Sequence, residues 1–348
     1  MNKLFKIVLF ILLSISVLLP SCKKEEQKPS LTTDPVSQIS RTSARGNGSI
    51  INEGADTATY YGFCWSTRTQ PTIDDNMVST SDMTSRDFNA EIGLLSPGTT
   101  YYVRTYALTA ANKYYGNQKS FTTKAATAKT TFNPKLTYQT VNDIDGNIYK
   151  TIKIGTQEWM AENLKTTRFR DGTIIPLVAN TEDWKTLKTP VYCWFSNDGA
   201  VFKNIYGAYY NWYVVNTGLL CPFGWHVPGE EDWKVLKLFL GMTPEQVESE
   251  YFPDTDAGNK IKETGTYNWI EESVTASNES GFTALPGGSR GEGGDFGGEG
   301  GGGGWWSATQ MAQHFFPFSH WVVSHAGWIF KSEMISQNYG LNVRCVKN

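Results

Sequence analysis

The feature that most restricts the fold is a strict alternation of side chains between residues 101 and 107. A repeat of two residues is typical of a half-buried β-strand. One side of this strand carries Tyr101, Val103, Thr105 and Ala107, and the other carries Tyr102, Arg104 and Tyr106. Further short strands are expected at 49–52, 60–66, 88–94 and 114–121, with turn residues between them. About seven short strands in a segment of this length are typical of a β-sandwich.

Residues 95–101 carry the pattern Leu95-x-Pro97-x-Thr99-x-Tyr101. This pattern resembles the entry to the sixth strand of fibronectin type III domains, and the resemblance implies that Tyr101 is a tyrosine corner. The stretches 62–66 and 115–123 resemble the version found in Bacteroidetes surface proteins. We therefore expect a fibronectin type III-like β-sandwich over residues 36–123. Such modules are usually spacers, and Cys64 is expected to be a buried, unreactive thiol.

The chain changes character after a linker at residues 124–136. Asp145-Gly146 separates two short β-forming runs within residues 141–154, which is a strong hairpin signal. Residues 229–240 place apolar side chains at helical spacing after three acidic residues, which suit a helix start. Gly241 is expected to end this helix.

Several motifs follow one another between residues 137 and 348. They are WMAENL (159–164), YGAYYNW (206–212), LCPFGWHVP (220–228), GNKIKETGTYNW (258–269), NESGFTALPGG (278–288), GGWWSAT (303–309) and YGLNVRCVKN (339–348). Together they resemble the Fibrobacter succinogenes major paralogous domain over essentially its full length. The resemblance implies an α+β variant of the C-type-lectin-like fold, related to formylglycine-generating enzymes. The whole chain would then be β-rich and multidomain.

The N-terminus carries Lys3 and Lys6 and then an apolar run from residue 7 to residue 19. This run is too short for a membrane span but suits a signal peptide. Residues 19–22, Leu-Pro-Ser-Cys, resemble a bacterial lipobox, which implies cleavage after residue 21 and acyl chains such as palmitate on Cys22. An ordinary secretion signal with an incidental cysteine is the alternative.

Residues 23–26, Lys-Lys-Glu-Glu, resemble the export signal of Bacteroidetes lipoproteins. The resemblance implies that the protein is lipid-anchored in the outer membrane and faces the cell exterior. The alternative is that these charged residues only begin a solvated tether and carry no export signal. The polar stretch to residue 35 is expected to be flexible.

Four cysteines remain besides Cys22. Lectin-like folds bring the chain end back beside the central helix, so the resemblance implies a disulfide between Cys221 and Cys345. Cys193 is the rival partner. The cysteine arrangement of formylglycine-generating enzymes has no counterpart here, so that activity is not expected.

Twelve of the 18 residues from 287 to 304 are glycine. We expect a long loop on the variable face of the second domain, without the pattern of a phosphate-binding loop. Arg290, Asp295 and Phe296 are its distinctive side chains and its candidate ligand contacts. Of Trp305 and Trp306, at least one is expected in the core, and an exposed partner could stack on a sugar ring.

The sequence gives little support for a metal site, a nucleic acid-binding site or a catalytic site. His320 and His325 differ in strand parity and Pro317 interrupts the approach from His314, so no zinc site is expected. The residue triplets of calcium-dependent lectins are missing, although the loop at 254–256 could hold calcium weakly. The net charge of −3 without a basic block argues against nucleic acid binding. The carboxylates Glu230, Glu231 and Glu263 show no pairing, so neither an enzyme nor a cofactor is expected.

The organisation predicts a surface lipoprotein that presents a lectin-like binding or adhesion domain on a β-sandwich spacer. Its partners would be the membrane, through the lipid anchor, and a glycan or a surface protein. A docking subunit of a cell-envelope complex is the alternative, and a polysaccharide-degrading enzyme is a third hypothesis. Fold-level analogy alone does not choose among them.

Overall fold

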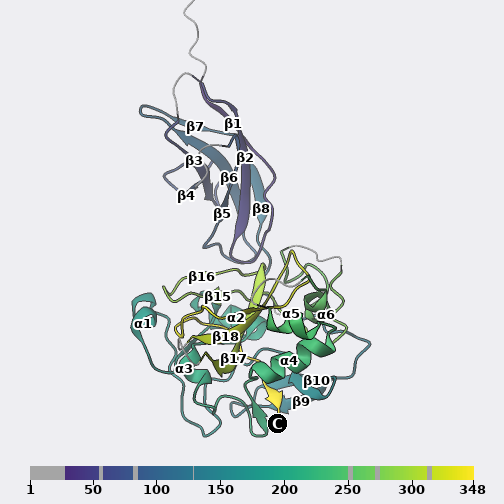
Figure 1. Ribbon diagram of the computed structural model, residues 1–348. Coiled ribbons are helices and arrows are strands. Elements are labelled where there is room, and N and C mark those ends of the chain that lie inside the picture. The colour runs from purple at the N-terminus through teal and green to yellow at the C-terminus, as the bar shows by residue number, and fades with distance from the viewer. Residues whose placement is uncertain are drawn as a thin grey trace, which may run out of the picture.

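The computed structural model describes residues 28–54, 58–80, 85–127, 129–249, 254–270, 275–311 and 316–348. The chain forms a β-sandwich followed by a larger, mixed domain, which we call the head (Figure 1). The predicted signal peptide, the predicted lipid attachment at Cys22, the predicted export signal and His314 lie outside the described residues.

The sandwich consists of two antiparallel sheets. The first has the order β1-β2-β5, and the second has the order β4-β3-β6-β7 with β8 also paired to β6. These strands are β1 (Ser30–Thr33), β2 (Ala44–Asn52), β3 (Tyr60–Ser66), β4 (Asn76–Ser79), β5 (Asp87–Ile92), β6 (Thr100–Leu108), β7 (Lys113–Tyr115) and β8 (Lys119–Thr122). The sandwich thus begins at Ser30, within the stretch expected to be tether, because β1 pairs with β2.

Strand β6 shows why the alternation was informative. All four side chains on its predicted inner side are buried, and Val103 and Thr105 have no exposed surface. The hydroxyl of Tyr101 accepts a hydrogen bond from the backbone N–H of Ser96 at 2.9 Å, as a tyrosine corner does. Tyr106, on the other side, is also buried, and its hydroxyl lies 3.0 Å from Ser79 Oγ at the end of β4. Cys64 is buried, and burial raises its pKa to about 12, so the thiol is unreactive.

The head contains several small sheets. The largest has the order β14-β20-β11-β10-β9, and another has the order β17-β18-β19. Their strands are β9 (Gln139–Asn142), β10 (Ile148–Ile154), β11 (Gln157–Met160), β14 (Trp225–His226), β17 (Gly302–Gln310), β18 (Pro317–Val323), β19 (Phe330–Ser332) and β20 (Val346–Lys347). Two short hairpin-like pairs are β12 (Tyr192–Cys193) with β13 (Tyr209–Tyr210), and β15 (Ser289–Arg290) with β16 (Phe296–Gly297).

Short helices cover these sheets (Figure 1). They are α1 (Thr181–Thr186), α2 (Gly199–Tyr206), α3 (Trp212–Val215), α4 (Glu230–Phe239), α5 (Pro244–Glu248) and α6 (Ala257–Ile261), with a 3₁₀ turn η1 (Phe195–Asn197). The predicted helix corresponds to α4, which buries Trp233 and Leu236, and Gly241 follows it with a φ of +97°. The predicted hairpin corresponds to β9 and β10, with Gly146 in the turn at a φ of +79°.

The disulfide joins Cys221 and Cys345, the pairing expected from the resemblance, and closes a sequence separation of 124 residues. It connects the loop before β14 to the residue that precedes β20, inside one hydrophobic cluster of the head. Cys193 lies in a different cluster, fully buried, and burial raises its pKa to about 12. The thiol of Cys193 is therefore a packed core group rather than a disulfide partner.

Candidate functional site

The contact between sandwich and head is built around Arg41, which has no exposed surface. Its guanidinium donates hydrogen bonds to Asn268 Oδ1 at 2.7 Å and to the Tyr206 hydroxyl at 2.9 Å, and it lies 3.3 Å from Glu299 Oε1. Its backbone N–H also donates to Glu299 Oε2 at 3.0 Å. An arginine of the first module therefore finds most of its partners in the second.

Glu299 and Tyr206 complete this buried network. Tyr206 donates its hydroxyl to Glu299 Oε1 at 2.5 Å, and burial, followed by the nearby Glu299 carboxylate, raises the pKa of the phenol well above its usual value. Burial opposes the charge of Arg41, but Tyr206 and Glu299 outweigh it and raise the pKa of the guanidinium. Removing one partner of such a buried, hydrogen-bonded ion pair destabilises the fold, because the other charge is then left buried without compensation.

Lys124, at the end of the sandwich, makes a second bridge to the head. Its ammonium donates to the backbone oxygens of Thr266 and Trp269, both at 2.6 Å. Burial lowers the pKa of Lys124 to about 8. The sequence predicts a spacer, and the structure adds that this module is bonded to the head through charged side chains.

A cleft of about 560 Å³ lies beside Arg41, between the two modules. The sandwich contributes residues 42–43, Glu91 and residues 93–97, and the head contributes Thr181, residues 195–198, Phe202 and residues 294–299. This is the size of a small-ligand or oligosaccharide site. In the following we call it the interdomain cleft.

The charges that line the interdomain cleft are all negative. They are the carboxylates of Glu91, Asp198, Asp295 and Glu299, and no lysine or arginine is part of the lining. Asp198 accepts the backbone N–H of Val201 at 3.1 Å and so caps α2, and Glu299 is occupied by Arg41 and Tyr206. Glu91 and Asp295, which come from different modules and are exposed, remain for a ligand.

Three phenylalanines form an aromatic wall of the cleft. Phe195 is buried and contacts Phe202 and Phe296, with ring centroids 5.1 and 5.3 Å apart. Phe296 is only half-buried, so part of its ring faces the cleft. The wall therefore offers one aromatic surface that is held in place from behind.

Backbone strain also gathers at the cleft. Ser196, Asn197 and Leu94 have φ values of 50°, 56° and 57°, although none of them is glycine. The amide of Asn197 donates to Ala179 O at 2.9 Å, which helps to hold the turn. The Leu94 side chain is fully exposed at 103% of its reference area. Such conformations cost of order 1 kcal/mol or more and are common at ligand sites.

The structure places the predicted ligand contacts unevenly. Asp295 and Phe296 line the cleft, but Arg290 has no exposed surface. Its guanidinium donates to Val178 O at 2.7 Å, Ala179 O at 3.0 Å and Gly294 O at 3.0 Å, and it lies 4.2 Å from the ring centroid of Trp184. Arg290 therefore holds the hairpin in place and is not free to contact a ligand.

Trp305 and Trp306 are both buried, so neither is available to stack on a sugar. They point to opposite sides of β17, as expected, but each side is covered by its own hydrophobic cluster. Their indole N–H groups donate to Asn163 Oδ1 at 2.9 Å and to Tyr210 O at 2.7 Å. The expectation of at least one core tryptophan is confirmed, and the alternative of an exposed partner does not hold because β17 runs between two cores.

The glycine-rich stretch is more regular than the expected loop. It forms the β15–β16 pair and then the first residues of β17. A Cβ at Gly303 would lie 2.2 Å from Leu285 O, and one at Gly304 would lie 2.8 Å from the ring of Trp321. Glycine at these two positions allows the close approach of neighbouring chain segments.

The remaining candidate side chains have partners of their own. In the described ranges no group of three or more His, Cys, Asp and Glu side chains could hold a metal ion. His320 pairs with Glu230, with His320 Nε2 2.9 Å from Glu230 Oε1, while Glu263 accepts from Asn268 at 2.7 Å. Sequence reasoning missed Arg41, Tyr206 and Glu299, because nothing near Arg41 in the sequence signals a partner 258 residues away.

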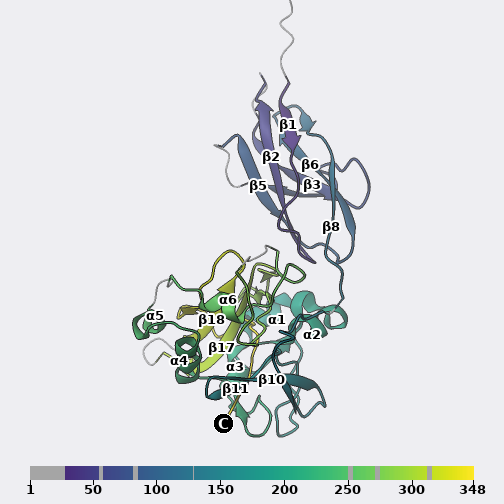
Figure 2. The same cartoon turned by 90° about the vertical axis from the view of Figure 1, so that its right-hand side faces the viewer.

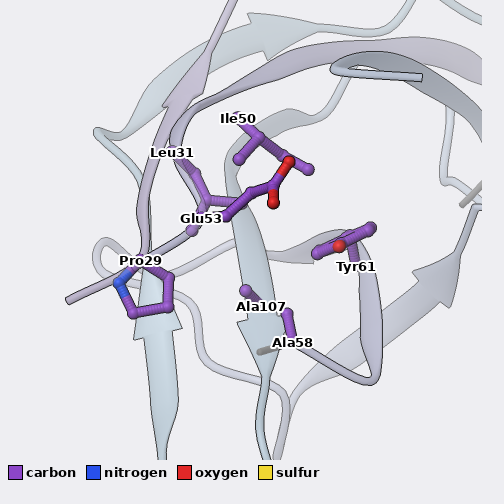
Figure 3. Close-up of a pocket in the computed structure, with 7 residues that line it drawn as sticks. All are labelled: Pro29, Leu31, Ile50, Glu53, Ala58, Tyr61 and Ala107. Carbon is purple, nitrogen blue, oxygen red and sulfur yellow. The ribbon is translucent and has the colours of Figure 1, made fainter. Parts of the chain in front are cut away.

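A small cavity of about 20 Å³ lies at the end of the sandwich where the described chain begins. Figure 3 shows its lining, which is Pro29, Leu31, Ile50, Glu53, Ala58, Tyr61 and Ala107. This volume holds about one water molecule and is too small for a ligand. Separately, none of the helices within the described ranges has the length and hydrophobicity of a membrane span.

Comparison with solved structures finds fibronectin type III domains among the similar chains. A fibronectin type III domain from human KIAA0970 is 15% identical, with 32% of this chain and 86% of that chain covered and a TM-score of 0.21. The chicken CNTN1 FN1–FN3 domains are 14% identical, with 28% of this chain and 30% of that chain covered and a TM-score of 0.22. The sensor domain of the anti-sigma factor RsgI4 from Pseudobacteroides cellulosolvens is 19% identical, with 28% and 97% covered and a TM-score of 0.22.

A search of curated proteins finds no match. The family model of the Fibrobacter succinogenes major domain matches residues 152–347, which include most of the head with the LCPFGWHVP loop, the glycine-rich hairpin and the disulfide. This match covers more than half of the chain, and the protein therefore belongs to the Fibrobacter succinogenes major domain family.

Proposed function

We propose that this protein is a non-catalytic binding protein of the cell surface that takes a neutral glycan in the interdomain cleft. The observation that carries the proposal is the cleft itself, which combines one supported aromatic ring, Phe296, with exposed carboxylates from both modules. A surface segment of another protein is the alternative occupant.

The chemistry of the cleft favours a neutral sugar over an anionic one. Carboxylates accept hydrogen bonds from sugar hydroxyls, and an aromatic ring offers a flat apolar surface to the C–H face of a pyranose. The lining has no lysine or arginine to neutralise an acidic sugar. Repulsion from Glu91 and Asp295 would therefore weaken the binding of a uronic acid relative to its neutral parent.

Catalysis is not part of the proposal. Asp198 and Glu299 are committed to capping α2 and to the Arg41 network. Asp295 and Glu91 are exposed, whereas the general acid of a glycoside hydrolase is held in an apolar environment. Carboxylates that are either committed to the fold or exposed to solvent are suited to binding a glycan rather than to cleaving its glycosidic bond.

The direction of the chain supports display away from a membrane. The described residues enter the sandwich at β1, at the end opposite the head (Figure 2). An acylated Cys22 followed by a short tether would hold that end near the outer membrane and present the interdomain cleft outward. This part of the proposal rests on the lipobox and export-signal resemblances. Cys22→Ala is expected to move the protein from the membrane fraction to the soluble fraction, and a variant that stays in the membrane fraction would contradict the lipid anchor.

A glycan array tests the binding proposal with the chain from residue 23 onward, so that both modules are present. We expect at least one neutral oligosaccharide to bind, and binding to weaken about tenfold for Phe296→Ala and severalfold for Asp295→Asn. Phe223→Ala and Asp171→Asn are matched controls, since both side chains are exposed outside the cleft.

Binding that is unaffected by Phe296→Ala and Asp295→Asn would refute the cleft as the site. An array without any bound sugar, together with co-purification of neighbouring envelope proteins, would refute glycan binding and favour the docking alternative.

A further inference from the structure

A second cavity, of about 270 Å³, lies in the head and shares no lining residue with the interdomain cleft. It is bounded by α4 and α5, the end of β17, and strands β18 and β19. Helix α4 lies beside β17 and β18 in Figures 1 and 2. Its lining is Glu230, Glu231, Trp233, Lys234, Lys237, Val247, Glu248, Thr309, Phe318, His320 and Lys331. In the following we call it the α4 cavity.

Lys237 is the unusual member of this lining. Its side chain is 98% buried, since only 2% of its surface is exposed. An ammonium group carries three hydrogen-bond donors, and no hydrogen bond or ion pair joins the Lys237 ammonium to another described residue. Its Nζ is not one of the fully enclosed polar atoms that lack a partner, so the ammonium keeps access to the space of the cavity. Burial lowers its pKa to about 8, so at neutral pH the group is mostly charged.

The other cations around the α4 cavity have partners. Lys234 Nζ lies 2.8 Å from Glu248 Oε1, and Lys331 Nζ lies 2.8 Å from Glu333 Oε1. Lys237 is therefore the cation in this cavity without a direct hydrogen-bond partner, since the carboxylates of Glu230 and Glu248 act on it only through space.

His320 does not supply the missing partner. It stacks on Trp233 with ring centroids 4.3 Å apart, and its Nε2 bonds to Glu230. Burial lowers the pKa of His320 to about 4, so the ring is neutral at pH 7 and Nε2–H is the donor. Glu230 thus already receives a hydrogen bond, and its charge acts on Lys237 without a direct contact.

We propose that the α4 cavity binds a small molecule with a carboxylate group, and that the Lys237 ammonium is the anchor of that carboxylate. A buried charge without a partner is unfavourable, and a ligand carboxylate would supply a charge-assisted hydrogen bond. Trp233, Val247 and Phe318 provide apolar contacts for the carbon skeleton. The cavity is at the small end of ligand sites, which suits a single sugar acid or a peptide C-terminus.

Isothermal titration calorimetry on the whole chain tests this with two matched pairs of probes. Glucuronate is compared with glucose, and N-acetylglycine with N-acetylglycinamide. We expect at least one carboxylate to bind and its neutral partner to bind at least tenfold more weakly. Which carboxylate binds separates a sugar acid from a peptide terminus. The absence of binding by both carboxylates, or equal binding of the neutral partners, would overturn the proposal.

Lys237→Met locates the site, and Lys153→Met, on the exposed side of β10, is the control for loss of one charge. We expect Lys237→Met to weaken carboxylate binding at least tenfold without lowering the thermal unfolding midpoint, and Lys153→Met to leave binding unchanged. A structural role for Lys237 would instead lower the midpoint. Should Lys237→Met not fold, Lys237→Gln retains length and donors and should still weaken binding. Unchanged binding in the folded variant would refute the site.

The pH dependence gives a second readout. The charged or titratable groups that face Lys237 are Glu230, Glu231 and Lys234 on α4, Glu248 on α5, His320 on β18 and Lys331 on β19. We expect carboxylate affinity to fall up to tenfold per pH unit above about pH 8, as Lys237 loses its proton. Constant affinity from pH 7 to 9.5 would contradict the proposal. None of these outcomes depends on whether the interdomain cleft binds a glycan.

Discussion

Arg41 at the module interface and Lys237 in the α4 cavity are both buried cations, but their surroundings differ. Arg41 is bonded to an amide, a phenol and a carboxylate, and its pKa is raised. Lys237 has no direct partner, and its pKa is lowered. A buried cation with its partners in place holds two parts of a molecule together. A buried cation without partners lowers the stability of the fold unless another molecule supplies an anionic partner.

The contrast between Arg41 and Lys237 can be measured only in a head that stays folded, and the disulfide is expected to stabilise that fold. Cys221→Ala/Cys345→Ala opens a loop of 124 residues and is expected to lower the free energy of unfolding by about 5 kcal/mol. Urea unfolding measures this loss. Cys193→Ala, which removes a buried thiol but no crosslink, should have a clearly smaller effect. Equal effects of the two changes would contradict a stabilising disulfide.

Replacing Arg41 is expected to cause a large loss of stability. Arg41→Met leaves the Glu299 carboxylate buried beside Tyr206 without its cation, and should lower the unfolding free energy by about 3–5 kcal/mol. Scanning calorimetry should also separate the sandwich and head transitions. Arg68→Met, whose ion pair with Asp75 is exposed on the arginine side, is the control and should change stability by less than about 1 kcal/mol. Similar behaviour of the two variants would refute the interface network.

Replacing Lys237 is expected to change the free energy of unfolding in the opposite direction to the replacement of Arg41. The pKa of Lys237 is about 8 in the folded protein, below its ordinary value of 10.5, which applies to the unfolded chain. The unfolded chain therefore binds more protons between these values, and the destabilisation is fully present below about pH 8 and disappears as the pH rises to about 10.5. Lys237→Met should raise the unfolding free energy at pH 7 by about 1–3 kcal/mol. Chemical denaturation at pH 7 and 10.5 checks this, since the gain should vanish at the higher pH.

A loss of stability in Lys237→Met at pH 7 would show that the ammonium stabilises the head, and the contrast with Arg41 would then fail. Lys153→Met, an exposed lysine on β10, should leave stability unchanged at both pH values.

The smallest expected effect concerns the sandwich wall of the interdomain cleft. Leu94→Ala removes a fully exposed apolar side chain at the rim and should weaken glycan binding about threefold, with little change in stability. Ile51→Ala, on β2 outside the cleft, is the matched control. Equilibrium binding of the two variants is compared. An unchanged affinity for Leu94→Ala would mean that the sandwich supports the cleft without contacting the ligand.

Local patterns predicted much of the fold. The alternation in β6, the Asp145-Gly146 turn and the acidic start of α4 each depend on residues close in sequence, and the structure bears each of them out. The disulfide followed from the family resemblance rather than from spacing.

The site was predicted only in part, because its members meet through tertiary contacts. Asp295 and Phe296 lie in the cleft, but Arg290 is turned inward by backbone oxygens that are 111–112 residues away in the sequence. Trp305 and Trp306 are covered on both sides by clusters that no local pattern reveals. The partners of Arg41 in the head are between 165 and 258 residues distant, and the missing partner of Lys237 is visible only when its whole surroundings are known.

An NMR titration of the whole chain with a neutral oligosaccharide identified on the array tests most directly whether the two modules share one glycan site. Backbone amide signals are expected to shift in both walls of the interdomain cleft, at residues 91–96 of the sandwich and 294–299 of the head, while those of α4 stay in place. Shifts confined to one module, or centred on α4, would contradict a glycan site shared by the two modules.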